Sequence, residues 1–260
     1  MSEQSTFIEV SVEAFFDTVF PKHSSIRSTL YDSVELDTSL LKGHALEVDT
    51  YPSLIEFINN VGSGTKKYQC MDVADWADFA LGKDTRRADL SIFKSDPASK
   101  KFWCDPKFEP GDKCSEARRP HTARNCVSQA VCGGEVKMKS DKNGFGMTGK
   151  EPFLPESQKA QQTRAQICGY AADILNHQQR TFVLMFYVYR THARLLLVDR
   201  GAVLVSQPID LEKNWAMFAK FFHCLKTAPV AGLGYDPTAN MLPKDPGSNA
   251  DYKALQEALT

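Results

Sequence analysis

The chain has 260 residues, of which 42% are hydrophobic and 24% charged, a composition that suits one large globular domain or two small ones. Its formal net charge of -1 excludes a chain-wide basic surface, so contact with nucleic acid would need a local basic patch. No apolar run is long enough to span a bilayer, and Met1–Thr6 is too polar for a signal peptide. We therefore expect no membrane contact and an intracellular protein, cytoplasmic or nuclear.

The seven cysteines support that location, because they are an odd number in a chain too long to need disulfides. We expect free thiols. Some of them surround a histidine in the way a zinc site would, but no close Cys-x-x-Cys pair is present, which argues against zinc. These residues are Cys104, Cys114, His121, Cys126 and Cys132.

Two helices are predicted in the first quarter of the chain. Ser11–Phe20 has an N-cap serine, one apolar face and a proline after it. Pro52–Val61 has a broad apolar face and ends at the Gly62-Ser63-Gly64 segment. Between them, Leu40–Val48 fits a helix or a strand equally well.

The middle of the chain contains two predicted strands separated by a long loop. Asp89–Phe93 places Leu90 and Ile92 on one face, and Gln129–Met138 is the second strand. Residues 95–126 are polar, contain four prolines and show little periodicity, which predicts a surface loop.

The last third predicts one long helix, three strands and an aromatic helix. Glu156–Gln178 is the long helix, and Arg180–Tyr189 is apolar enough for a central strand covered on both faces. Ala193–Val198 and Val203–Ser206 follow as strands, and the aromatic residues of the helix Leu211–Leu225 should pack on the sheet.

This order predicts an α/β (α+β) fold, with a mixed central sheet flanked by helices. We expect residues 1–227 to form a single domain. Residues 228–260 are rich in Pro, Gly and Asn at first and predict a linker, followed by a short helix from about Asp251.

The segment VCGGEVKMKS at residues 131–140 is the candidate site. Glu135 and Lys137 are two positions apart in a strand, so both should lie on one face. With Asp89 on the preceding strand, they resemble the pattern of the PD-(D/E)XK nuclease fold. In that interpretation Asp89 and Glu135 would bind Mg²⁺ and Lys137 would stabilise phosphate charge. The alternative is a solvated strand face that carries no chemistry.

Two further residues belong to this interpretation. Gln166, on the long helix, takes a place where such folds often have a polar residue near the site. Glu56 could reach the site from the helix Pro52–Val61, and the favoured alternative is that it is an ordinary solvated helix acid. The densest basic cluster is in the predicted loop and could hold a nucleic-acid backbone, although an ordinary soluble loop would look the same. Its candidate nucleic-acid contacts are Arg118, Arg119 and Arg124.

Several short motifs in the second half occur together and in order. The sequence resembles the N-terminal, pre-kinase part of the fungal-type protein kinases, over roughly residues 10–255. Ala88-Asp89 and Gly134-Glu135-Val136-Lys137 match the corresponding strand motifs of that family. The other matching segments are residues 164–171 (RAQICGYA), 177–181 (HQQRT), 193–195 (ARL), 199–202 (DRGA), 205–206 (VS) and 234–238 (GYDPT).

The resemblance implies a region that precedes a kinase domain, and these 260 residues contain none of the phosphoryl-transfer motifs. A Val-Ala-Ile-Lys strand, a His-Arg-Asp loop, Asp-Phe-Gly and a glycine-rich phosphate loop are all absent from the sequence. We therefore expect no ATP binding. The predicted function is a non-catalytic or degenerate nuclease-like module that regulates or binds a protein kinase domain, in cis or in trans. The alternative is an active Mg²⁺-dependent nuclease acting on DNA or RNA.

Overall fold

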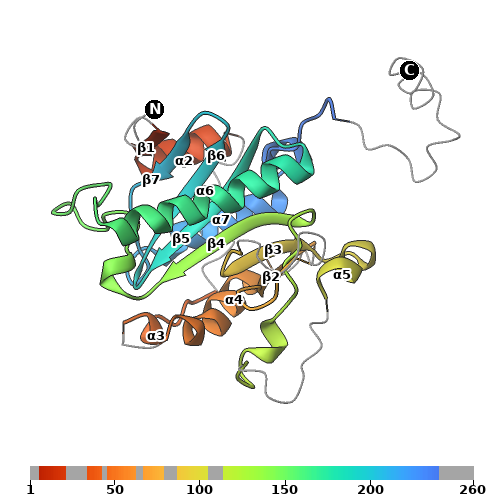
Figure 1. The fold of residues 1–260 in the computed structure, drawn as a ribbon, viewed down its shortest axis with the longest axis horizontal. Helices are drawn as coiled ribbons and strands as arrows, with labels where there is room; N and C mark the ends of the chain where they lie inside the picture. Colours follow the sequence, from red (N-terminus) through yellow and green to blue (C-terminus); the bar gives the residue numbers. More distant parts are fainter. Residues whose placement is uncertain are drawn as a thin grey trace, which may run out of the picture.

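A mixed eight-stranded sheet forms the centre of the molecule in the computed structural model, with helices on both faces (Figure 1). The structure describes residues 6–21, 34–42, 46–62, 67–78, 87–104 and 114–239. The strand order is β1-β7-β6-β5-β4-β3-β2, and the short β8 pairs with β6. This confirms the predicted α/β class with a mixed sheet flanked by helices.

The strands are β1 (Phe7–Val10), β2 (Tyr68–Asp72), β3 (Leu90–Lys94), β4 (Ala130–Lys137), β5 (Phe182–Tyr189), β6 (His192–Asp199), β7 (Val203–Ser206) and β8 (Ile209–Asp210). The helices are α2 (Val12–Val19), α3 (Ser39–Lys42), α4 (Tyr51–Asn60), α5 (Pro97–Trp103), α6 (Gln158–Gln178) and α7 (Trp215–Thr227). The described residues also form four short 3-10 turns: η2 (Glu47–Thr50), η3 (Arg119–His121), η4 (Ser140–Lys142) and η5 (Val230–Leu233).

The centre of the sheet is the parallel pair β4 and β5, which α6 connects. A parallel pair needs such a crossover, and both of its faces are normally covered, which explains the nearly unbroken apolar run of β5. Its residues 183–188 are all buried. β1 and β7 form the other parallel pair, and the remaining pairs are antiparallel.

The two faces of the sheet carry separate apolar cores. Leu184 and Phe186 pack with residues of α2, α4 and α7 on one face. Val183 and Met185 pack with α6 on the other. Figure 1 shows α6 crossing one face of the sheet and α7 lying behind the other. This alternation is the period of two of an extended strand.

The aromatic residues of α7 pack on the sheet, as their spacing predicted. The ring of Phe222 meets that of Phe186 edge to face, with centroids 5.3 Å apart, and Phe218 stacks on Phe57 of α4 at 6.0 Å. Fully burying side chains of this size contributes about 1.5–3 kcal/mol each, so α7 is held mainly by these rings.

The structure corrects the predicted loop over residues 95–126. Residues 97–103 form α5, because Asp96 caps its first turn by accepting hydrogen bonds from Ala98 N and Ser99 N, and Pro97 is preorganised for the first helical position. Trp103 anchors the helix by stacking on Phe93 of β3 at 5.2 Å. The ambiguous segment 40–48 falls into the short helix α3 and the start of η2, with residues 43–45 outside the described part.

Residues after α7 pack against the sheet through Arg180. Its guanidinium donates hydrogen bonds to the carbonyl oxygens of Ala130, Val131 and Leu233, and it lies 4.0 Å from the ring centroid of Tyr235. Residues 228–239, at the start of the predicted linker, are therefore attached to the domain. The short helix predicted from Asp251 lies outside the described residues, so the domain boundary stays a prediction.

Two chain-wide expectations concern membranes and thiols. Among the described residues, no helix is both long and apolar enough to cross a membrane. All seven cysteines lie in the described segments, and none of them takes part in a disulfide.

Candidate functional site

The candidate site lies where β3 and β4 separate. Leu90 pairs with Gly134 at the end of their ladder, and Asp89 N donates the last main-chain bond to Gly134 O at 3.1 Å. β4 continues to Lys137 without β3 beside it. The Asp89 carboxylate replaces the missing strand by accepting a hydrogen bond from Val136 N at 2.8 Å. Thus the chain geometry itself directs Asp89 toward the end of β4.

The ammonium group of Lys137 is the centre of the site. Its Nζ lies 2.6 Å from Glu135 Oε1, 3.2 Å from Asp89 Oδ2 and 3.3 Å from Glu47 Oε1. It also donates to Val136 O at 2.9 Å. We call the side chains of Glu47, Asp89, Glu135 and Lys137 the acid–lysine cluster.

Burial determines the electrostatics of this cluster. The Glu135 side chain is only 2% exposed, and burial raises its pKa well above the usual value, with the nearby Asp89 charge adding to the effect. Burial also raises the pKa of Glu47. Burial alone would lower the pKa of Lys137, but the negative charges of Asp89, Glu135 and Glu47 together raise it. Lys137 is therefore held as an ammonium ion.

Two tyrosines border the cluster. Tyr51 of α4 is buried, and its hydroxyl donates to Glu47 Oε1 at 3.5 Å. Burial raises the pKa of Tyr51, and the Asp89 charge raises it further. Burial likewise raises the pKa of Tyr170 on α6, followed by the charge of Glu135. These phenols stay protonated and can donate hydrogen bonds to carboxylates.

The structure brings together three of the four predicted site residues: Asp89, Glu135 and Lys137. Glu135 and Lys137 share one face, as the alternation along β4 predicted, and it is the face covered by α6, because Glu135 pairs with Tyr187 of that core. Gln166 is exposed on α6. On the same helix, Tyr170 is close enough for the charge of Glu135 to raise its pKa. A site role for Gln166 stays a prediction.

Glu47, and not Glu56, is the acid that the first part of the chain contributes to the cluster. The Glu56 side chain is 65% exposed, and its Oε1 lies 3.6 Å from His121 Nε2. Glu47 supplies the third carboxylate from η2, directly before α4. The sequence contained a weak signal for it, because acidic residues favour the first turn of a helix, but residues 40–48 did not predict where that turn begins.

The cluster as arranged does not fit a bound metal ion. No group of three or more His, Cys, Asp or Glu side chains in the described segments is placed to hold one. This includes the zinc candidates around His121. The acids of the cluster bind an ammonium group in the space that a divalent cation would need, and Asp89 Oδ2 is already bonded to Val136 N and Lys137 Nζ. Hard carboxylate oxygens suit Mg²⁺, but here they neutralise a lysine.

The three arginines predicted to contact nucleic acid differ in their solvent exposure. Arg118 is buried and forms ion pairs with Asp72 at 2.7 Å and Asp75 at 2.9 Å. Arg119 is exposed and Arg124 is half-buried. Breaking the buried ion pair between Arg118 and Asp72 would leave the charge of Asp72 uncompensated. The Arg118 guanidinium therefore has a structural role and is not placed to bind a nucleic acid.

One comparison with known proteins gives a match. Residues 153–255 match the model of the fungal protein kinase family. The matched range contains α6, β5, β6, β7 and α7, and it lies after the strands β3 and β4 that carry the cluster. The match supports a relation between the second half of this chain and that family. No curated protein and no solved structure matches the chain.

Proposed function

We propose that the chain is a non-catalytic, nuclease-like module related to the fungal-type protein kinases, with a regulatory or binding role toward a kinase domain in cis or in trans. The observation that carries the non-catalytic part is the position of Lys137 Nζ, within 3.3 Å of three carboxylates. Each of those acids forms an ion pair with Lys137. The lysine therefore could not bind a phosphate without breaking these ion pairs.

The kinase relation rests on the family match and on the motifs of the second half. The chain supplies no residues in the pattern that phosphoryl transfer requires, so the proposal assigns the catalytic step to another domain. ATP is not a cofactor in this proposal. Thermal denaturation with and without Mg²⁺-ATP tests this point, because a ligand at about 100 times its Kd would stabilise the fold by about 2.7 kcal/mol.

The deciding experiment is a cleavage assay with Mg²⁺ or Mn²⁺ on single- and double-stranded DNA and RNA. We expect no cleavage by the wild type above the level of the Lys137→Ala variant. Metal-dependent cleavage that disappears in Lys137→Ala, with the fold intact by circular dichroism, would replace this proposal with the second candidate.

The second candidate is an active Mg²⁺-dependent nuclease of the PD-(D/E)XK type, with Asp89 and Glu135 as metal ligands. One observation favours it: the buried Glu135 Oε2 finds no hydrogen-bond partner among the described residues. A buried carboxylate oxygen without a partner is costly, and a cation would satisfy it. For this function Lys137 would have to leave its position between the acids, and the exposed Arg119 would be a candidate contact for the nucleic acid.

A further inference from the structure

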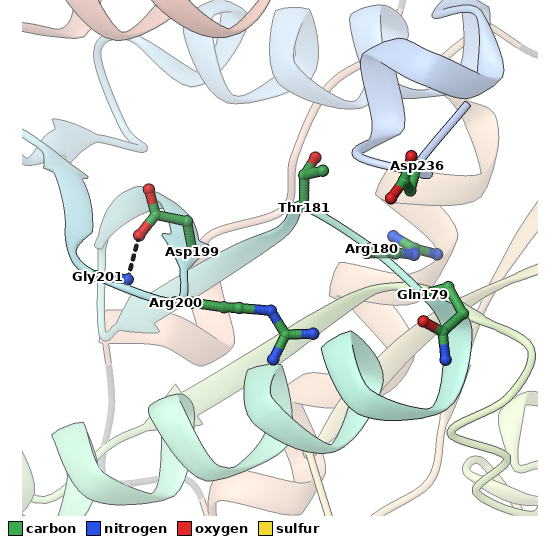
Figure 2. Close-up of a pocket in the computed structure, with 7 residues that line it drawn as sticks. All are labelled: Gln179, Arg180, Thr181, Asp199, Arg200, Gly201 and Asp236. Atoms are coloured by element: carbon green, nitrogen blue, oxygen red, sulfur yellow. Dashed lines mark hydrogen bonds between the residues drawn. The ribbon is translucent and has the colours of Figure 1, made fainter. Parts of the chain in front are cut away.

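A polar cavity of about 480 Å³ opens where β5 begins, far along the chain from the acid–lysine cluster. Figure 2 shows Arg200 extended toward the end of α6, with Asp199 on one side of the cavity and Asp236 on the other. Its lining consists of Gln179, Arg180, Thr181, Asp199, Arg200, Gly201 and Asp236. The β6–β7 turn is held rigid here, because Asp199 Oδ1 accepts hydrogen bonds from Gly201 N at 2.7 Å and Ala202 N at 2.6 Å.

A second cavity of about 350 Å³ adjoins the first, since the turn residues 199–201 line both. Its lining is more apolar. Leu175, Val198 and Val203 are nearly buried, and Cys168 and Ala172 of α6 are more exposed. We call the two cavities together the paired hollow. It offers an apolar floor at one end and both signs of charge at the other.

The paired hollow gathers three segments that the proposed function leaves unused. They are the motif segments 177–181, 199–202 and 234–238, which are distant in sequence and lie within the range matched by the kinase family. Arg180 has a structural role inside the wall, whereas Arg200 Nη1 donates a long hydrogen bond to Asn176 Oδ1 at 3.4 Å. A place where such segments meet is a natural binding surface.

The chain itself supplies an occupant of matching chemistry. Asp236 lines the cavity, and the described chain ends three residues later, so the sequence that follows starts at the edge of the hollow. In that sequence Tyr252, Leu255 and Leu259 recur at the spacing that would place them on one side of a helix. Residues 240–250 can span up to about 36 Å when extended, so the segment can reach both cavities.

We propose that residues 251–259 dock into the paired hollow of their own chain, with Tyr252, Leu255 and Leu259 on its apolar floor. The charges are complementary. Asp251 and Glu257 of the segment can meet Arg200, and Lys253 can meet the carboxylate of Asp199 or Asp236. The apolar contacts provide affinity, and the charges set the orientation.

The reaction rate of the Cys168 thiol, which lines the second cavity, reports on this docking directly. Its labelling by a maleimide, followed by mass spectrometry of each cysteine, should be slowed by a docked segment. Cys104 is exposed at the end of α5 and is the internal control. A tether of this length gives an effective concentration of about 1 mM, so even a contact with a Kd of about 0.1 mM slows labelling about tenfold.

The comparison uses the full chain, a chain ending at Ala239, and a full-length variant with Tyr252, Leu255 and Leu259 all changed to Ser. We expect Cys168 to react about tenfold faster in the second and third proteins, at equal Cys104 rates. A synthetic 240–260 peptide should slow Cys168 again in the shortened chain. Arg200→Glu should weaken the protection, and Lys101→Glu on α5 is its matched control.

Three outcomes would overturn the proposal. Equal Cys168 rates in the full chain and the triple Ser variant would show that the segment does not cover the hollow. Protection that grows with protein concentration would assign the segment to a second copy. Protection by the triple Ser peptide equal to that of the native peptide would remove the apolar side as the cause. The triple Ser variant keeps the test valid even where the shortened chain fails to fold.

Discussion

Lys137 and Lys226 are both buried, and their surroundings give them opposite properties. Lys137 lies among three carboxylates, which raise its pKa. Lys226 of α7 meets only carbonyl oxygens, those of Ile58 at 2.5 Å, Asn59 at 3.3 Å and Val61 at 2.7 Å. Burial lowers the pKa of Lys226 to about 8. Burial alone therefore does not determine the charge of a lysine; the charge of its partners does.

The largest effect is expected from removing Lys137. Lys137→Ala leaves the acids of the cluster buried without a cation, which should cost about 3–5 kcal/mol of unfolding free energy. Urea denaturation at pH 7 measures it. Lys213→Ala is the control, because that side chain is 80% exposed and pairs with Asp210 at the surface, so its denaturation midpoint should hardly move. A Lys137→Ala midpoint as high as that of the control would show that the cluster is not a structural ion pair.

The second effect is a pH dependence of the unfolding free energy that distinguishes Lys226 from Lys137. Its folded pKa of about 8 is below the usual 10.5, so between these values the unfolded chain binds more protons than the folded one. Stability from this group therefore rises with pH over that window, by on the order of 2–3 kcal/mol, and is flat below it. Urea denaturation from pH 7.5 to 10.5 should show that the unfolding free energy of the wild type rises relative to that of Lys226→Met. Both proteins contain the same thiols, so the effect of thiol titration largely cancels in the difference.

Replacing Lys226 at neutral pH should have a smaller effect than replacing Lys137. Lys226→Met removes the hydrogen bonds to the last carbonyl groups of α4 but also removes a buried charge, so we expect a net loss of about 1–2 kcal/mol. Hydrogen exchange should locate the loss at the C-terminal turn of α4. Loosening spread evenly over the sheet would contradict the capping role of this lysine.

The smallest effect should come from Glu135→Gln. Burial raises the pKa of Glu135 and so opposes its charge, and Asp89 and Glu47 still balance Lys137 when a glutamine amide of nearly the same shape replaces Glu135. The change in stability should stay below about 1 kcal/mol. A loss as large as that of Lys137→Ala would mean that Glu135 carries the charge that holds the lysine.

The sequence predicted those parts of the fold in which pattern and burial agree. The apolar run predicted as a central strand over Arg180–Tyr189 forms β5 (Phe182–Tyr189), and the alternation of Glu135 and Lys137 placed both on one face. The sequence-based prediction missed α5, because the N-cap Asp96 and the following Pro97 were the only local sign of a helix in a segment that otherwise looks like a loop. Edge strands such as β1, with only four residues, carry too little periodicity to be recognised.

Three of the four residues of the acid–lysine cluster were predictable for the same reason. Glu135 and Lys137 are neighbours in one strand, and Asp89 begins another, so strand geometry alone suggested that they meet. Glu47 is 88 positions from Glu135 and reaches the cluster only because η2 packs on α4 and α4 packs on β2. Contacts that depend on tertiary packing leave no local pattern in a single sequence.

The Arg180 network also has a mechanical consequence. One guanidinium fastens β4 and the residues after α7 to the start of β5, and Thr181 N adds a bond to Gly234 O at 2.8 Å. Gly234 fits closely there, because its φ is 85° and a Cβ would come within 2.1 Å of Phe182 O. A pull on the chain beyond Ala239 is therefore transmitted to the middle of the sheet before it can unravel α7. Whatever is attached there starts from a fixed anchor point, so its distance from the paired hollow is set by the linker alone.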